Sequence, residues 1–117
     1  MAELQRFHVG PRLSEMAVHN GAIYLAGQVP DDPSKDIKGQ TAEVLAMVDR
    51  LLAEAGSDKS RILMTQIFLK DIGEIGQMNE VWDAWIPAGH TPPRATVQAA
   101  MANEQYRIEI VVTAAKA

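Results

Sequence analysis

The chain has 117 residues, which is the size of one domain and is long enough to bury a core without disulfides. Its net charge is −4, from 11 Lys and Arg against 15 Asp and Glu, and no three cations are adjacent; this balance argues against a nucleic-acid-binding protein. The sequence contains no cysteine, which excludes thiol nucleophiles and cysteine-ligated metals, and no apolar run of about 20 residues that could span a bilayer. We therefore expect a single soluble, cytoplasmic domain over residues 1–117.

The first third of the chain predicts three strands. Apolar and polar residues alternate within residues 3–9, which favours a strand that ends at Gly10-Pro11. Residues 14–19 and 22–26 are two runs of strand length on either side of Asn20-Gly21. Because Asn-Gly supplies the positive φ angles of a type I′ turn, this pattern predicts a β-hairpin.

Two later segments have the apolar spacing of helices. The first covers residues 37–55, and Gly56 follows it where a left-handed residue would end a helix. Its apolar stripe consists of Val44, Met47, Val48, Leu51, Leu52 and Ala55. The second helix is predicted over residues 76–85, where it buries Met78, Val81, Trp82 and Trp85.

Three further strands are predicted over residues 62–69, 94–99 and 106–115. The order of elements predicts an α+β domain with a sheet of about six strands and helices on one face. The last strand is apolar on both faces, with Ile108, Ile110, Val112 and Ala114 on one and Val111 and Ala115 on the other. Since two helices cover only one face, we expect the other to pack against further copies of the chain.

Two residues in this second half are candidates for chemistry. A proline-rich loop places Arg94 at the start of a strand, and a planar guanidinium can bind a carboxylate through two parallel hydrogen bonds. An exposed arginine in a surface ion pair is the alternative. Glu109, between two isoleucines, lies either on a solvated face or in a cleft where it can act as an acid or base. His8, His19 and His90 lack the spacing of a metal site.

The chain resembles the RidA (YjgF) family of reactive-intermediate deaminases over about residues 9–116. The resemblance rests on six short motifs that occur in the family's order, and the segment 82–98 is most similar to the YoaB-like branch. The motifs are Gly10-Pro11, the segment 25–30 (LAGQVP), the segment 68–71 (FLKD), the segment 78–85 (MNEVWDAW), the segment 93–97 (PRATV) and the segment 107–110 (RIEI).

This resemblance implies a chorismate-mutase-like α+β fold with a mixed sheet, assembled as a homotrimer with ligand sites between subunits. It implies hydrolysis of 2-enamine and 2-imine acids of the 2-iminopropanoate type to 2-keto acids and ammonia. It implies no metal or organic cofactor. The binding partner that it implies for the protein is a small imino or keto acid, and not nucleic acid or a membrane. The family has also carried an endoribonuclease label, against which the acidic charge balance argues.

The resemblance also assigns site residues. Arg94 matches the arginine that binds the substrate carboxylate, and Glu109 matches the glutamate that orients the hydrolytic water. Thr96 falls where the family usually has a cysteine whose backbone takes part in the site. Gly27 and Asn79 match further positions that line or support the cleft.

Two positions depart from the family pattern. Arg12 stands where the deaminases have a tyrosine after Gly-Pro, and Ala26 replaces a serine before Gly27. Both changes remodel the expected pocket, and Arg12 either adds a cation to it or is an exposed loop arginine. They favour a second interpretation, a non-enzymatic trimer that binds a small carboxylate such as a keto acid. Glu109 distinguishes the two, because a protein that only binds an anion has no use for a carboxylate beside it.

Overall fold

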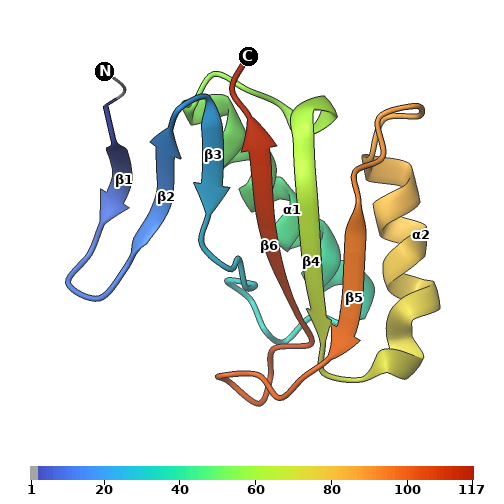
Figure 1. Ribbon diagram of the computed structural model, residues 1–117. Helices are drawn as coiled ribbons and strands as arrows, with labels where there is room; N and C mark the ends of the chain where they lie inside the picture. The colour runs from blue at the N-terminus through green and yellow to red at the C-terminus, as the bar shows by residue number, and fades with distance from the viewer. Residues whose placement is uncertain (1–2) are drawn as a thin grey trace.

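A six-stranded mixed sheet carries both helices in the computed structural model, which describes residues 3–117 (Figure 1). The strands lie in the order β1-β2-β3-β6-β4-β5. The predicted α+β architecture is confirmed. The strands are β1 (Gln5–Val9), β2 (Ser14–His19), β3 (Ala22–Leu25), β4 (Ile62–Leu69), β5 (Arg94–Gln98) and β6 (Ile108–Ala115), and the helices are α1 (Ile37–Glu54) and α2 (Ile75–Trp85).

The predicted hairpin is formed by β2 and β3. Asn20 and Gly21 have φ angles of 51° and 77°, as a type I′ turn requires, and the turn sets the register in which Val18 pairs with Ile23. Strand β1 pairs with β2 in antiparallel fashion and forms one edge of the sheet.

Helix α1 begins where the sequence predicts and ends at Glu54, one residue earlier than predicted. The Asp36 carboxylate accepts a hydrogen bond from the Gly39 N–H at 2.9 Å and caps the first turn. Gly56, with a φ of 75°, supplies the left-handed residue after the helix. All six residues of the predicted stripe are buried. Helix α2 begins one residue earlier than predicted, and Val81 and Trp85 are only partly buried beside the buried Met78 and Trp82.

The last two strands are shorter than predicted. Strand β5 ends at Gln98 rather than residue 99, and β6 begins at Ile108 rather than residue 106. The difference at β6 arises because the Arg107 N–H donates to the buried Gln40 side chain at 2.7 Å, and not to a neighbouring strand. Strand β5 is parallel to β4, whereas β6 is antiparallel to both β3 and β4.

The core lies between the helices and one face of the sheet. Ile108, Ile110, Val112 and Ala114 of β6 are buried on this face, as predicted. Figure 1 shows α1 behind the centre of the sheet and α2 beside β5. The opposite face, which we call the open face, has no helix over it within residues 3–117 and carries Tyr24, Met64, Phe68, Val97 and Val111. In the described part of the chain, neither helix has the length and hydropathy of a membrane span.

Candidate functional site

Glu109 lies on the open face, where it pairs with Phe68 of β4 across the sheet. The side chain is half-buried and lines a hollow of about 240 Å³ together with Phe68 and the segment 99–101. The remaining wall residues are apolar or small. A ligand-binding pocket typically has a volume of about 300–1,000 Å³, so this hollow is smaller than a typical small-molecule site.

Gly27 lies directly against the Glu109 carboxylate. A Cβ atom at position 27 would come within 2.0 Å of Oε2 and 2.8 Å of Cδ of Glu109. The backbone beside it is fixed, because the Gln28 N–H donates to the Ile110 carbonyl at 2.8 Å and the Ile110 N–H donates back at 3.0 Å. The absence of a side chain at Gly27 therefore allows the carboxylate to occupy this position.

Arg94 lies at the first position of β5, beside α2. The Thr65 N–H donates to the Pro93 carbonyl at 3.0 Å and holds the backbone there. The guanidinium carbon of Arg94 lies 5.2 Å from the centroid of the Trp82 ring, which belongs to α2 and is 5% exposed. Over residues 3–117, the half-buried guanidinium has no carboxylate partner. An unneutralised cation held in this way can bind an anion.

Thr96 and Asn79 lie close to Arg94 in the fold. Thr96 is two residues further along β5 and faces the same side of the sheet, while Asn79 is one helical turn before Trp82. The Thr96 hydroxyl and the Asn79 side-chain oxygen are buried, and neither has a hydrogen-bond partner within the described residues. Buried polar atoms without partners are rare and are characteristic of sites that take a ligand or water.

The backbone of Thr96 faces the free edge of the sheet. The Ala99 N–H donates to the Leu69 carbonyl at 2.9 Å, which places the N–H groups of odd-numbered residues of β5 toward β4. By alternation, the N–H of Thr96 points away from β4. It can therefore donate to a ligand at the free edge of the sheet.

The structure separates these residues into two half-sites on opposite faces of the sheet. Arg94 pairs with Thr65, which is fully buried toward the helices, so the Arg94 side chain lies on the helical face. Glu109 pairs with Phe68 and lies on the open face. We name the two groups the arginine half-site (Arg94, Thr96 and Asn79) and the glutamate half-site (Gly27 and Glu109). Within one chain, the two groups therefore point away from each other across the sheet.

Arg12 forms no ion pair within residues 3–117, and so none with a residue of either half-site. It is exposed in the turn between β1 and β2, which the Gly10 N–H closes by donating to the Leu13 carbonyl at 2.9 Å. Ala26 immediately precedes Gly27, and its N–H donates to the Glu15 carbonyl at 2.9 Å. The chemical effect of Arg12 therefore depends on what lies against this turn.

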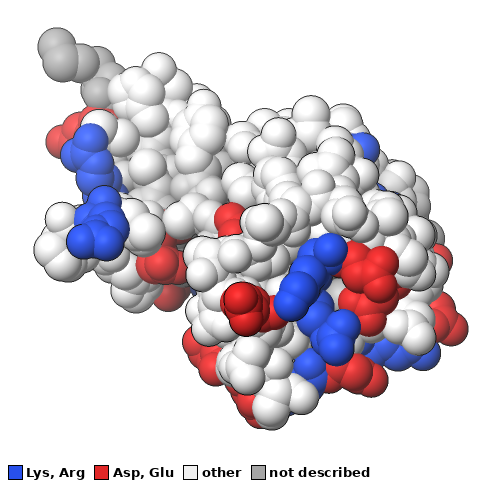
Figure 2. Space-filling view, turned by 90° about the horizontal axis from the view of Figure 1, so that it is seen from below, with Lys and Arg blue, Asp and Glu red and all other residues white. Residues whose placement is uncertain are grey.

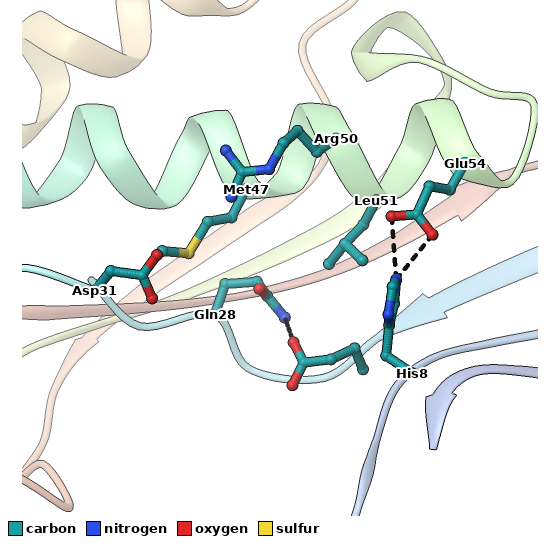
Figure 3. Close-up of a pocket in the computed structure, with 8 residues that line it drawn as sticks. His8, Gln28, Asp31, Met47, Arg50, Leu51 and Glu54 are labelled. Carbon is teal, nitrogen blue, oxygen red and sulfur yellow. Dashed lines mark hydrogen bonds and ion pairs between the residues drawn. The ribbon is translucent and has the colours of Figure 1, made fainter. Parts of the chain in front are cut away.

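A separate hollow of about 280 Å³ lies between α1 and the start of the sheet (Figure 3). In it, His8 Nε2 lies 2.8 Å from the nearer Glu54 oxygen, and the Gln28 amide donates to Glu15 at 3.0 Å. None of the site residues predicted from the sequence lines this hollow. His8, Glu54, Gln28 and Glu15 bond one another there, whereas Asp31 and Arg50 line the hollow without a side-chain partner within residues 3–117.

Other cationic side chains of the chain form ion pairs with carboxylates at the surface. Lys35 pairs with Glu43 at 2.7 Å and Arg107 with Glu74 at 3.1 Å. The hydrogen bond from Lys35 lowers the pKa of Glu43 below its ordinary value. Figure 2 shows basic and acidic side chains next to one another on the face that it displays. Arg94 differs from these arginines and lysines because it is held by an aromatic ring.

The sequence pattern does not predict that Trp82 lies beside Arg94. The apolar spacing of α2 assigned this residue to the core, and it is indeed buried. The signal in the sequence is weak, because the two residues are 12 positions apart and meet only when β5 folds against α2. Among the described residues, no group of three or more His, Asp or Glu side chains is placed to hold a metal ion.

Comparison with known proteins gives consistent matches over nearly the whole chain. The family model described as Endoribonuclease L-PSP matches residues 4–116. A RutC family protein of Haemophilus ducreyi is 46% identical over 112 residues, which are 96% of this chain and 96% of that protein. The RutC family protein YoaB of Escherichia coli is 44% identical over 94% of this chain and 96% of its own length. The crystal structure of a YjgF-family protein from Neisseria meningitidis superposes with a TM-score of 0.96 at 47% identity, covering 98% of this chain and 96% of that one.

Proposed function

The chain belongs to the Endoribonuclease L-PSP family, whose relatives carry the names RutC and YjgF, and we propose that it hydrolyses 2-enamine and 2-imine acids to 2-keto acids and ammonia. The resemblance of the sequence to the RidA (YjgF) family and its YoaB-like branch is thereby confirmed. The observation that carries the proposal is the half-buried Arg94 guanidinium, held over Trp82 without a carboxylate partner within residues 3–117. A substrate carboxylate is the ligand that suits it best.

In the proposed reaction, Arg94 and the Thr96 N–H bind the carboxylate of the substrate and present its C2 imine carbon. Glu109 accepts a proton from a water molecule as the water oxygen bonds to C2 of the protonated imine, which gives a neutral carbinolamine. Glu109 then returns this proton to nitrogen, the C2–N bond breaks, and ammonia leaves as Glu109 accepts the hydroxyl proton and the C2 carbonyl forms. Such acid–base participation typically contributes about 10²–10⁴-fold in rate, and neither a metal nor an organic cofactor takes part in it.

We propose that each site forms between two protomers of a homotrimer. The separation of the half-sites supports this assembly, because a neighbour's open face must supply Glu109 to the Arg94 of the first protomer. The open face also supports it, since Tyr24 is 52% exposed and Val97 is 48% exposed. Apolar side chains gathered on one surface are characteristic of a protein interface. A closed ring of three gives every protomer the same contacts.

The proposed function is tested by measuring ammonia and keto acid release from 2-imino acids generated in the assay by an amino-acid oxidase. The wild type should accelerate release over the buffer rate, and Arg94→Ala should not. Equal release with and without the protein, while the protein still binds a keto acid, would instead favour a trimer that only binds small carboxylates.

Gly27→Ala should reduce turnover by about a hundredfold while leaving the fold intact, because a displaced catalytic group costs rate even when it remains present. The added Cβ would lie 2.0 Å from Glu109 Oε2, so the flexible end of that side chain must move away. Steady-state turnover and a thermal melt measure the two effects. Gly76→Ala is the matched control, since its Cβ meets nothing within 4 Å. If Gly27→Ala retains the turnover of this control, the carboxylate position does not matter for the reaction.

A further inference from the structure

Two tryptophans of α2 each lie beneath a cation. Arg94 lies 5.2 Å from the centroid of Trp82, and Lys59 Nζ lies 5.1 Å from the centroid of Trp85. The two rings are neighbours, with centroids 5.5 Å apart and planes inclined at 48°. The chain has no other tryptophan. One of these tryptophans can therefore be tested for an effect on Arg94, and the other serves as a control in the same helix.

The two rings are fixed in different ways. The Trp85 Nε1–H donates to Asp49 of α1 at 2.9 Å, so this ring joins the two helices. Trp82 is 5% exposed within the core, and the face of its ring supports the Arg94 guanidinium. An arginine side chain is long and flexible, and a bidentate hydrogen bond requires its planar fork to be held in one orientation.

We infer that Trp82 is a positioning residue, whose indole face holds the Arg94 guanidinium ready to bind the substrate carboxylate. This inference rests on the proposed function, in which that carboxylate is the ligand. The cation over the ring leaves the N–H edges of the guanidinium free for the acid. Without the ring, the side chain must be ordered when the ligand binds, and affinity falls by that cost.

The binding test uses pyruvate as a probe, measured by calorimetry. Trp82→Leu should weaken pyruvate binding by about twofold to thirtyfold, the range expected for loss of one cation–π contact. Trp82→Phe keeps an aromatic face and should recover part of the affinity, and it covers the case in which Trp82→Leu does not fold. Trp85→Phe should bind as the wild type does. In turnover assays, the Trp82 variants should raise KM more than they lower kcat.

Fluorescence gives a readout that a merely structural tryptophan would not produce. Trp85→Phe leaves Trp82 as the sole tryptophan, and its emission should change on pyruvate addition with the Kd found by calorimetry. Trp82→Phe leaves Trp85, whose emission should stay constant. Unchanged Trp82 emission during binding, or wild-type affinity in Trp82→Leu, would overturn the inference alone. If the wild type does not bind pyruvate, or Arg94→Ala binds it equally well, the proposed function fails and the inference falls with it.

Discussion

Arg94→Lys is expected to remove most of the deaminase activity although it keeps the positive charge. A lysine ammonium is a point charge that cannot form two parallel hydrogen bonds with a carboxylate. Losing a hydrogen bond to a charged group costs about 1.5–3 kcal/mol, which corresponds to about tenfold to 150-fold in kcat/KM. The shorter reach of lysine along the Trp82 face adds to this loss. Steady-state kinetics with enzymatically generated 2-imino acids measure the effect.

Arg61→Lys is the matched control for this substitution. Arg61 is exposed, and its guanidinium donates to the Lys116 carbonyl at 3.0 Å, away from both half-sites. It should keep wild-type kinetics. Near-wild-type turnover in Arg94→Lys would show that the substrate carboxylate is held elsewhere. Arg12 would then be the first residue to test, because a partner protomer could lie against its exposed turn.

Glu109→Gln is expected to cut turnover by about tenfold to a thousandfold while preserving affinity for a keto acid. The amide keeps the shape and hydrogen-bonding capacity of the side chain but cannot accept the proton of water near neutral pH. Removing a negative charge near a bound anion should, if anything, tighten pyruvate binding. Turnover measurements and calorimetry on the same preparation separate the two effects.

Glu54→Gln provides the comparison. Glu54 belongs to the hollow of Figure 3, where its carboxylate lies 2.8 Å from His8. This variant should keep wild-type turnover if the reaction takes place at Glu109. If Glu109→Gln turns over as fast as the wild type, Glu109 does not activate water, and the non-enzymatic carboxylate-binding trimer becomes the better account.

Most of the fold is predictable from the sequence because its signals are local. The Asn20-Gly21 turn, the stripe of α1 and the left-handed Gly56 all act within a few residues, and each is confirmed. Whether Arg107 belongs to β6 depends on a contact with Gln40, which is 67 positions away. The local sequence pattern does not predict this contact. The parallel pairing of β4 with β5 is also not visible in the local pattern. It requires the chain to cross over through α2, which lies between the two strands in the sequence.

The identities of the candidate site residues follow from the family resemblance, but their arrangement does not. Arg94 and Glu109 each occur in a short motif, and neither motif tells which face of the sheet the side chain takes. That depends on the register of β5 and β6 against β4, where a shift of one residue would move either side chain to the other face. The structure therefore adds the separation into two half-sites and the contact between Arg94 and Trp82.

The central claim is that one active site takes its arginine and its glutamate from different protomers. Co-expression of Arg94→Ala and Glu109→Gln chains with different affinity tags, followed by purification on both tags, yields mixed oligomers. In a mixed ring of three, one site receives an intact Arg94 and an intact Glu109, so about one third of wild-type turnover should return although each parent alone falls well below that level. Turnover that stays at the level of the parents, in oligomers shown by mass spectrometry to contain both chains, would contradict the claim.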